Sequence, residues 1–188
     1  MKRRFAITAS LLGPIAGDRP MLRRSVALLL PFALWTAICG GVTAMNIPLF
    51  NPSFEEPLAG GVPPGWPTTF GGVAFGGPEI ALSDQRAFDG RYSIRIDDPY
   101  PDRGIGLRSS HVPAEPGAHY VATVQVYRES GAAQLYLEFW DSGQNRIGVE
   151  IGSATKLQTW ESLGVQGTAP AGTATLTLLL YSHGANQG

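Results

Sequence analysis

Cysteine is nearly absent from this chain of 188 residues, whose single cysteine is Cys39. A disulfide framework and a thiolate-ligated zinc site each need several cysteines, so the sequence excludes both. No cysteine follows position 44, which also excludes a thiolate nucleophile in that part of the chain. Charged residues are few as well, at 15% against 44% hydrophobic residues. This composition is too apolar for a disordered chain and too poor in charge for a coiled coil.

Basic residues become scarce after position 44. Six of the 14 Lys and Arg residues, but only one of the 15 Asp and Glu residues, precede position 45. The remaining segment therefore has 8 basic and 14 acidic residues, which gives it a net charge of −6. Because proteins bind nucleic acids through clustered Lys and Arg, we expect no nucleic-acid partner.

No apolar run reaches the roughly 20 residues that a membrane-spanning helix needs. An apolar stretch over residues 25–38 follows the basic Met21-Leu-Arg-Arg segment and precedes the small residues of Val42-Thr-Ala44. This order is typical of a signal peptide, so we expect a leader and signal peptide over residues 1–44 with cleavage after Ala44. Residues 1–20 look like a second basic leader, which makes Met21 a candidate start. The mature protein is expected to be secreted, periplasmic or at the cell surface, without membrane contact.

Helical periodicity is missing from residues 45–188, where apolar and polar residues alternate and Gly and Pro mark frequent turns. The clearest hairpin joins residues 133–140 to 147–151 through Asp141-Ser-Gly143-Gln, in which Gly143 is expected to take a positive φ. The sequence thus predicts one all-β domain, an antiparallel β-sandwich or jelly roll. Further strands are expected over residues 92–97, 120–127, 160–165 and 173–181.

Several short motifs occur in an order that resembles the carbohydrate-binding modules of the galactose-binding-like jelly-roll superfamily. The resemblance covers residues 46–188 and implies a galactose-binding-like jelly roll over residues 45–188. Such modules continue into a last strand with an Asp-Asp pair, which is not found before Gly188. Either the sequence is a fragment that lacks this strand, or the domain closes in another way. The motifs are Asn51-Pro-Ser-Phe54-Glu55-Glu56, Pro64-Gly-Trp66, Phe88-Asp-Gly90, Phe139-Trp-Asp141-Ser-Gly143, Trp160 and Thr168-Ala-Pro170-Ala-Gly172.

Alternation within residues 133–140 defines a candidate binding face. Leu135, Leu137 and Phe139 point to one side of a strand, which leaves an amide, a phenol, a carboxylate and an indole on the other. Aromatic rings can stack on the C–H faces of sugars while amides and carboxylates bind their hydroxyl groups, although cross-strand stabilisation of the sheet is the alternative interpretation. Thr123, Thr175 and Thr177 are expected beside this face. The expected carbohydrate-binding residues are Gln125, Tyr127, Gln134, Tyr136, Glu138, Trp140 and Tyr181.

A structural calcium ion is a further expectation that follows from the resemblance. The modules that this chain resembles often hold calcium through a Glu after the Phe of the first motif and through an Asp-Gly turn. Glu55, Asp89 and Gly90 match these positions. Calcium takes six to eight oxygen ligands, and an Asp of the closing strand would be a third contributor. A solvated acidic edge is the alternative interpretation.

Signals for catalysis are few. His111, His119 and His183 lie far apart and lack the spacing of a helical zinc site. The acid pairs at positions 55–56 and 97–98 are adjacent in sequence, so on a strand their side chains point to opposite faces and cannot flank one glycosidic bond. We therefore expect a non-catalytic module that binds a polysaccharide or glycan, accessory to a larger polysaccharide-active protein with a C-terminal catalytic domain. The alternatives are a structural or adhesive spacer that binds no sugar and a small lyase or hydrolase.

Overall fold

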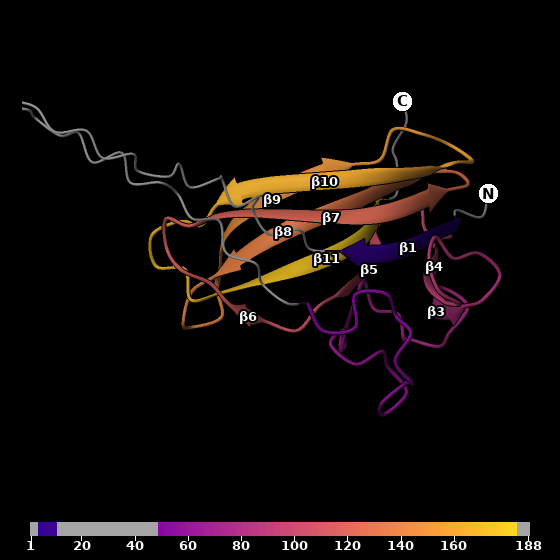
Figure 1. The fold of residues 1–188 in the computed structure, drawn as a ribbon, viewed down its shortest axis with the longest axis horizontal. Helices are drawn as coiled ribbons and strands as arrows, with labels where there is room; N and C mark the ends of the chain where they lie inside the picture. The colour runs from indigo at the N-terminus through magenta and orange to yellow at the C-terminus, as the bar shows by residue number, and fades with distance from the viewer. Residues whose placement is uncertain (1–3, 11–48, 184–188) are drawn as a thin grey trace, which may run out of the picture.

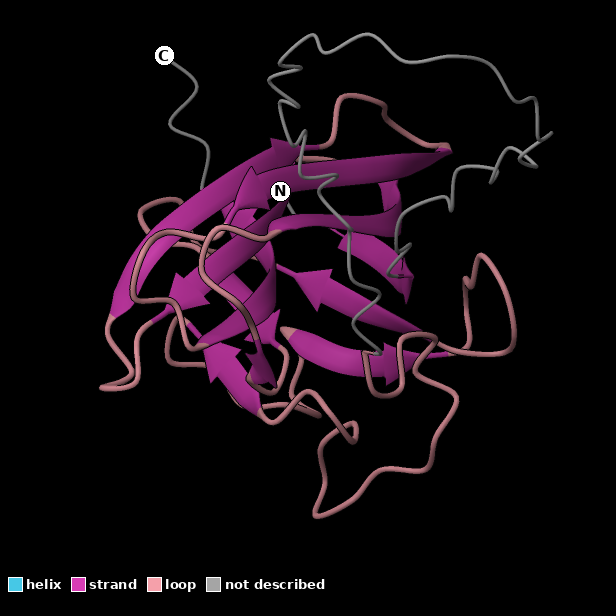
Figure 2. Cartoon of the chain, turned by 60° about the vertical axis from the view of Figure 1, so that its left-hand side comes forward, coloured by secondary structure: helices cyan, strands magenta, loops and turns pink. Residues whose placement is uncertain are grey.

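The computed structural model describes residues 4–10 and 49–183. These residues form strands, turns and loops and contain no helix (Figure 2). The expectation of an all-β chain is therefore confirmed for the described residues. In the same ranges, no helix is long and apolar enough to span a membrane.

Five strands form one antiparallel sheet in the order β10, β7, β1, β4, β3 (Figure 1). The longest pairing in this sheet joins β10 to β7, from Trp160 opposite Tyr127 to Thr168 opposite His119. The strands are β10 (Trp160–Thr168), β7 (His119–Arg128), β1 (Arg4–Ser10), β4 (Ser93–Asp97) and β3 (Ile80–Ser83).

The second sheet has the order β2, β5, β11, β8, β9, with β6 paired to β11 as a sixth strand. Its centre is the β8–β11 pair, which runs from Thr175 opposite Trp140 to His183 opposite Ala132. The strands are β2 (Thr68–Phe70), β5 (Ile105–Arg108), β6 (Val112–Pro113), β8 (Ala132–Trp140), β9 (Arg146–Ser153) and β11 (Thr175–His183).

The two sheets share one hydrophobic core, which gives the chain a β-sandwich-like architecture. Every second residue of β7 and β8 points into this core, as the alternation of the sequence predicts, and Val124, Leu135 and Leu137 are at most 1% exposed. Burial of one such aliphatic side chain stabilises the fold by about 2 kcal/mol. The side chains at the intervening positions consequently cover the outer surfaces of the two sheets.

The predicted hairpin is confirmed, since β8 and β9 pair antiparallel around the turn at residues 141–145. The prediction for Gly143 is wrong: Gln144 is the residue with a positive φ, at 61°. Asp141 explains the difference, because its Oδ1 accepts hydrogen bonds from the Asn145 N–H at 2.9 Å and from the Asn145 side chain at 3.3 Å. These bonds lower the pKa of the Asp141 carboxyl and fix the turn so that the left-handed position is one residue later. The strands expected near residues 92–97, 120–127, 160–165 and 173–181 are also present as β4, β7, β10 and β11.

The amino-terminal strand β1 lies inside the segment that the sequence suggests is a leader. Its backbone pairs antiparallel with both β4 and β7, and it occupies the position between them (Figure 1). β1 is thus the strand that connects β4 to β7 in the five-stranded sheet. Cys39 and the expected cleavage site after Ala44 lie outside the described residues.

A turn-rich loop carries the first motif of the resemblance. The Phe54 and Trp66 side chains are fully buried and pack together with ring centroids 5.1 Å apart. The Trp66 Nε1–H donates to the backbone oxygen of Asn51 at 3.3 Å. Gly65 is required beneath this loop, because a Cβ on it would lie 2.7 Å from the Phe50 carbonyl oxygen. Trp66 is thus a packing residue that anchors the loop.

Candidate functional site

Five of the seven expected binding residues share the outer surface of the six-stranded sheet. Gln134, Tyr136, Glu138 and Trp140 occupy alternate outward positions of β8, and Tyr181 of β11 lies directly opposite Gln134. β5 brings Arg108 to the same surface through its pairing with Leu179 of β11. We call this surface the β8 face, defined by Gln134, Tyr136, Glu138, Trp140, Tyr181, Arg108, Arg146, Phe70 and His111.

Gln125 and Tyr127 do not join the β8 face. They lie on β7, which pairs with β1 and β10 in the five-stranded sheet. There the Tyr127 ring packs edge-on against Trp160 with centroids 5.7 Å apart, and the Arg86 guanidinium lies 3.9 Å from the Tyr127 centroid. Sequence alternation gives the correct side of each strand but not the sheet to which the strand belongs, so these two residues form a separate cluster.

An aromatic row on the β8 face runs from β8 over β11 to β2, with β5 between the last two strands. The ring centroids of Tyr136 and Tyr181 lie 5.2 Å apart, and those of Tyr181 and Phe70 lie 5.6 Å apart. Both tyrosines are half-buried, and Phe70 is 42% exposed. Gly104, next to β5, makes room for the central ring, because a Cβ on it would collide with the Tyr181 side chain. The row is therefore an ordered, partly exposed strip of ring surface.

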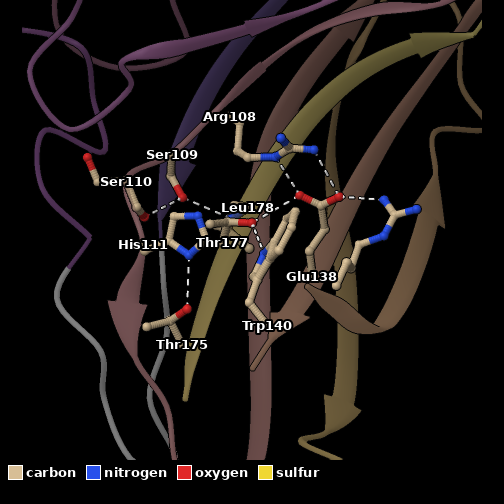
Figure 3. A network of polar contacts seen from close by, with 10 residues as sticks. Arg108, Ser109, Ser110, His111, Glu138, Trp140, Thr175, Thr177 and Leu178 are labelled. Atoms are coloured by element: carbon tan, nitrogen blue, oxygen red, sulfur yellow. Dashed lines mark hydrogen bonds and ion pairs between the residues drawn. The ribbon is translucent and has the colours of Figure 1, made fainter. Parts of the chain in front are cut away.

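A buried ion network lies beside this row (Figure 3). The Glu138 side chain is completely buried, and its carboxylate accepts four hydrogen bonds. Arg108 donates from Nε to Oε2 at 2.7 Å and from Nη2 to Oε1 at 3.2 Å. Arg146 donates from Nη1 to Oε1 at 2.7 Å, and the Thr177 hydroxyl donates to Oε2 at 3.0 Å. Glu138 is thus fully engaged with the protein and positions the two guanidinium groups.

Trp140 and His111 border the network on the β6 side. The indole N–H of Trp140 donates to Thr177 Oγ1 at 2.9 Å, so it is not free to bind a ligand. The His111 ring lies edge-on to the indole with centroids 5.2 Å apart, and its Nδ1 is 2.9 Å from Thr175 Oγ1 (Figure 3). Desolvation, with a further contribution from Arg108, lowers the pKa of His111 and favours the neutral imidazole. The half-buried indole ring remains the surface that Trp140 can offer to a ligand.

Both tyrosines of the row keep their phenolic protons at neutral pH. Burial raises the pKa of Tyr136, with an additional contribution from Tyr181. Burial also raises the pKa of Tyr181, together with the charge of Asp98, which lies on the other side of β11 where it accepts a hydrogen bond from Ser182. The Tyr136 hydroxyl donates to Gln134 Oε1 at 3.2 Å. The edge of the row thus carries phenol and amide groups that can both donate and accept hydrogen bonds.

Sequence reasoning missed four members of the β8 face: Arg108, Arg146, Phe70 and His111. Alternation within Ile105-Gly-Leu107-Arg108 predicts that Arg108 points outward. It does not predict the pairing of β5 with β11, because these strands lie about 70 residues apart in the chain. Arg146 reaches the face through an irregularity of the β8–β9 register between Phe139 and Trp140, which regular alternation does not predict.

The structure brings together the residues expected to bind calcium, Glu55 and the Asp89-Gly90 turn. Glu55 Oε1 accepts the backbone N–H groups of Arg91 at 2.9 Å and Tyr92 at 2.7 Å, so Glu55 does meet the turn after Asp89. The Asp89 carboxylate accepts the N–H of Gly90. Among the described residues no group of three or more His, Cys, Asp or Glu side chains could hold a metal ion. The Glu55 carboxylate holds this turn to the first loop, and calcium binding here stays a prediction.

No protein-family model matches this chain, and no curated protein matches it. The similarity to carbohydrate-binding modules therefore stays a resemblance of motifs. The geometry of the β8 face carries the functional argument.

Proposed function

We propose that this chain is a non-catalytic carbohydrate-binding module with a galactose-binding-like jelly-roll fold, and that it binds a polysaccharide or glycan on the β8 face. The observation that carries this proposal is the row of partly exposed rings formed by Phe70, Tyr181 and Tyr136. A hydrophobic strip flanked by a few fixed polar groups is the usual composition of a small-molecule site. Sugars match it, since they have apolar C–H faces and hydroxyl-bearing edges.

Contacts around the row support a defined binding geometry. Gln134 donates to Ser153 Oγ at 3.2 Å and accepts from Tyr136, so its amide is held in one orientation. The network around Glu138 fixes the two arginines in the same way. Groups that are already ordered lose little conformational freedom when a ligand binds, which raises affinity.

The same network favours binding over hydrolysis. Two carboxyl groups that face each other across the substrate are needed for the common mechanism of glycoside hydrolysis. Among the outward strand positions described on the β8 face, Glu138 is the single carboxylate, and its oxygens accept hydrogen bonds from protein groups. We propose accordingly that any catalytic activity belongs to a domain joined to this one, in a protein that is secreted or displayed at the cell surface.

Affinity electrophoresis of the full chain in gels that contain soluble polysaccharides tests the proposal. Tyr136→Ala and Tyr181→Ala remove the row, and we expect each to weaken retention about tenfold, which corresponds to about 1.4 kcal/mol of binding energy. Tyr127→Ala is the matched control, because it removes a half-buried tyrosine from the opposite sheet. It should leave retention unchanged.

Thermal melts of the same variants separate binding from folding. If Tyr136→Ala and Tyr181→Ala lose retention at unchanged melting temperature, the β8 face is a binding surface. If wild type is retained by none of the polysaccharides, or if Tyr127→Ala loses as much retention as the other two, the proposal fails. A wild-type chain that no polysaccharide retains would favour a structural or adhesive spacer.

A further inference from the structure

The β8 face carries more positive than negative charge. Two guanidinium groups, Arg108 and Arg146, share the one carboxylate of Glu138, and both donate to the same oxygen, Oε1. The lowered pKa of His111 beside them favours its uncharged form, so the two arginines carry the positive charge of this face. One positive charge is therefore left without a partner on this face, although the segment from residue 45 onward has a net charge of −6.

The unbalanced charge is accessible to a ligand. The Arg146 side chain is 45% exposed, and its Nε and Nη2 have no hydrogen-bond partner among the described residues. The Arg108 side chain is 16% exposed, and its Nη1 likewise has no partner. In the described part of the chain, the one buried side-chain nitrogen or oxygen without a partner is Asn51 Nδ2, so Nη1 of Arg108 reaches solvent. Both arginines thus retain N–H donors that point away from Glu138.

The N–H donors of the two arginines lie close to the aromatic row. Tyr136, Leu179 and Arg108 stand opposite one another on β8, β11 and β5, in one line across the sheet. The Arg108 guanidinium is 5.8 Å from the Phe70 ring and 5.2 Å from the Trp140 ring. Apolar neighbours exclude water and strengthen the attraction between a guanidinium group and an anion. A sugar stacked on Tyr136 or Tyr181 would bring its substituents to the arginines.

We infer that the β8 face selects anionic saccharides, whose carboxylate or sulfate group pairs with Arg108 and Arg146 while the sugar ring stacks on the aromatic row. The inference rests on the proposed carbohydrate-binding function and names its ligand class. Guanidinium groups suit this role because their forked N–H groups match oxyanions in two-point hydrogen bonds. Glu138 acts here as a positioning residue, since it holds both forks in place without a free oxygen for the ligand.

Isothermal titration of the full chain with matched saccharide pairs tests this inference. Oligogalacturonate is compared with the same oligomer after reduction of its carboxyl groups, and dextran sulfate with dextran, so that carboxylate and sulfate are tested separately. We expect at least one anionic member to bind about tenfold more tightly than its neutral partner. The preference should shrink as salt is raised, because ions screen the exposed Arg146.

Charge variants assign the preference to the two arginines. Arg146→Gln should abolish most of the preference for the anionic member over its neutral partner, and Arg146→Lys should keep part of that preference. The matched control is Arg86→Gln, since Arg86 also has a side chain that is 45% exposed, but belongs to the cluster around Tyr127. This control removes the same charge from the protein and should leave the preference unchanged.

The outcomes separate the two proposals. Equal binding of the neutral and anionic partners, or equal losses in Arg146→Gln and Arg86→Gln, would overturn the selection of anions and leave carbohydrate binding intact. Polyaspartate is included as a polyanion without sugar rings. If it binds as tightly as the anionic saccharides and Tyr136→Ala does not weaken them, then the face binds anions in general and the proposed carbohydrate function fails.

Discussion

Glu138 is the residue on which the geometry of the β8 face depends. It is fully buried, yet the partners that compensate its charge come from three other strands, β5, β9 and β11. A buried carboxylate is tolerated only when hydrogen bonds and opposite charges replace the water that it loses. Glu138 also holds two like-charged guanidinium groups close together. Without its negative charge, the two groups would repel each other and move apart.

Replacement of Glu138 by Gln should therefore destabilise the fold. The amide keeps one acceptor oxygen, but it turns an N–H₂ group toward guanidinium donors and removes the charge that balances them. We expect the free energy of unfolding to fall by about 2 kcal/mol, because the arginines are partly exposed and water can solvate part of their released charge. Urea denaturation measures the change. Glu56→Gln, at an exposed position, is the control, and an equally small loss in both variants would contradict this account.

His111 offers a test through pH. Burial and the charge of Arg108 lower its pKa in the folded state, whereas Glu138 acts in the opposite direction. Since the folded-state pKa lies below the unfolded value of about 6.5, the contribution of His111 to stability is present above pH 6.5 and is lost as pH falls through the folded pKa. NMR titration should give a midpoint below 6.5, and Arg108→Gln should raise it. A midpoint that is unchanged in Arg108→Gln would show that the two side chains do not interact.

Single residues illustrate what alternation can and cannot predict about the site. The outward direction of Gln134, Tyr136, Glu138 and Trp140 follows from the inward direction of their neighbours, and the structure confirms it. The sequence suggests that Glu138 contacts a ligand, yet the carboxylate is buried under two arginines that lie 30 and 8 residues away. Such pairing depends on the order of strands in the sheet, which period-two patterning does not contain.

Strands and hairpins were more accessible to sequence reasoning than the pairing between distant elements. The β8–β9 hairpin is local, so its two strands and its turn are encoded within 22 consecutive residues. β7 has an equally clear pattern, but its neighbours β1 and β10 lie far from it in the chain. The assignment of Gln125 and Tyr127 to the β8 face failed for this reason. The sequence does not reveal β1, because a short stretch near the start of the chain resembles part of a leader.

The turn of the β8–β9 hairpin gives a prediction at the scale of the element. Gln144 adopts a left-handed conformation with φ of 61°, which glycine tolerates better than residues with a Cβ. Gln144→Gly should raise the free energy of unfolding by about 0.5 kcal/mol, after allowance for the greater freedom of glycine in the unfolded chain. Chemical denaturation measures the effect. Ser142→Gly, at a neighbouring turn position without positive φ, should not stabilise, and stabilisation by both would point to a different turn.

At the scale of the whole molecule, the five-stranded sheet depends on its amino-terminal strand. β1 pairs with β7 over residues 5–10 and with β4 over residues 4–7, so it joins the β7–β10 pair to the β3–β4 pair. A strand position left open exposes two rows of unpaired backbone groups, which promote association with other chains. The stability of the five-stranded sheet therefore depends on whether residues 1–44 stay attached to the domain.

Removal of residues 1–44 should lower the melting temperature of the protein by more than about 10 °C, because the sheet would lose hydrogen bonds on both sides of β1. Thermal melts followed by circular dichroism compare residues 45–188 with the full chain. Ile7→Pro in the full chain is the matched variant, since it removes one backbone N–H in the middle of β1 and retains residues 11–44. Both changes should lower the melting temperature and promote aggregation. If both melt like wild type, β1 is not part of the cooperative unit, and the interpretation of residues 1–44 as a removable leader gains support.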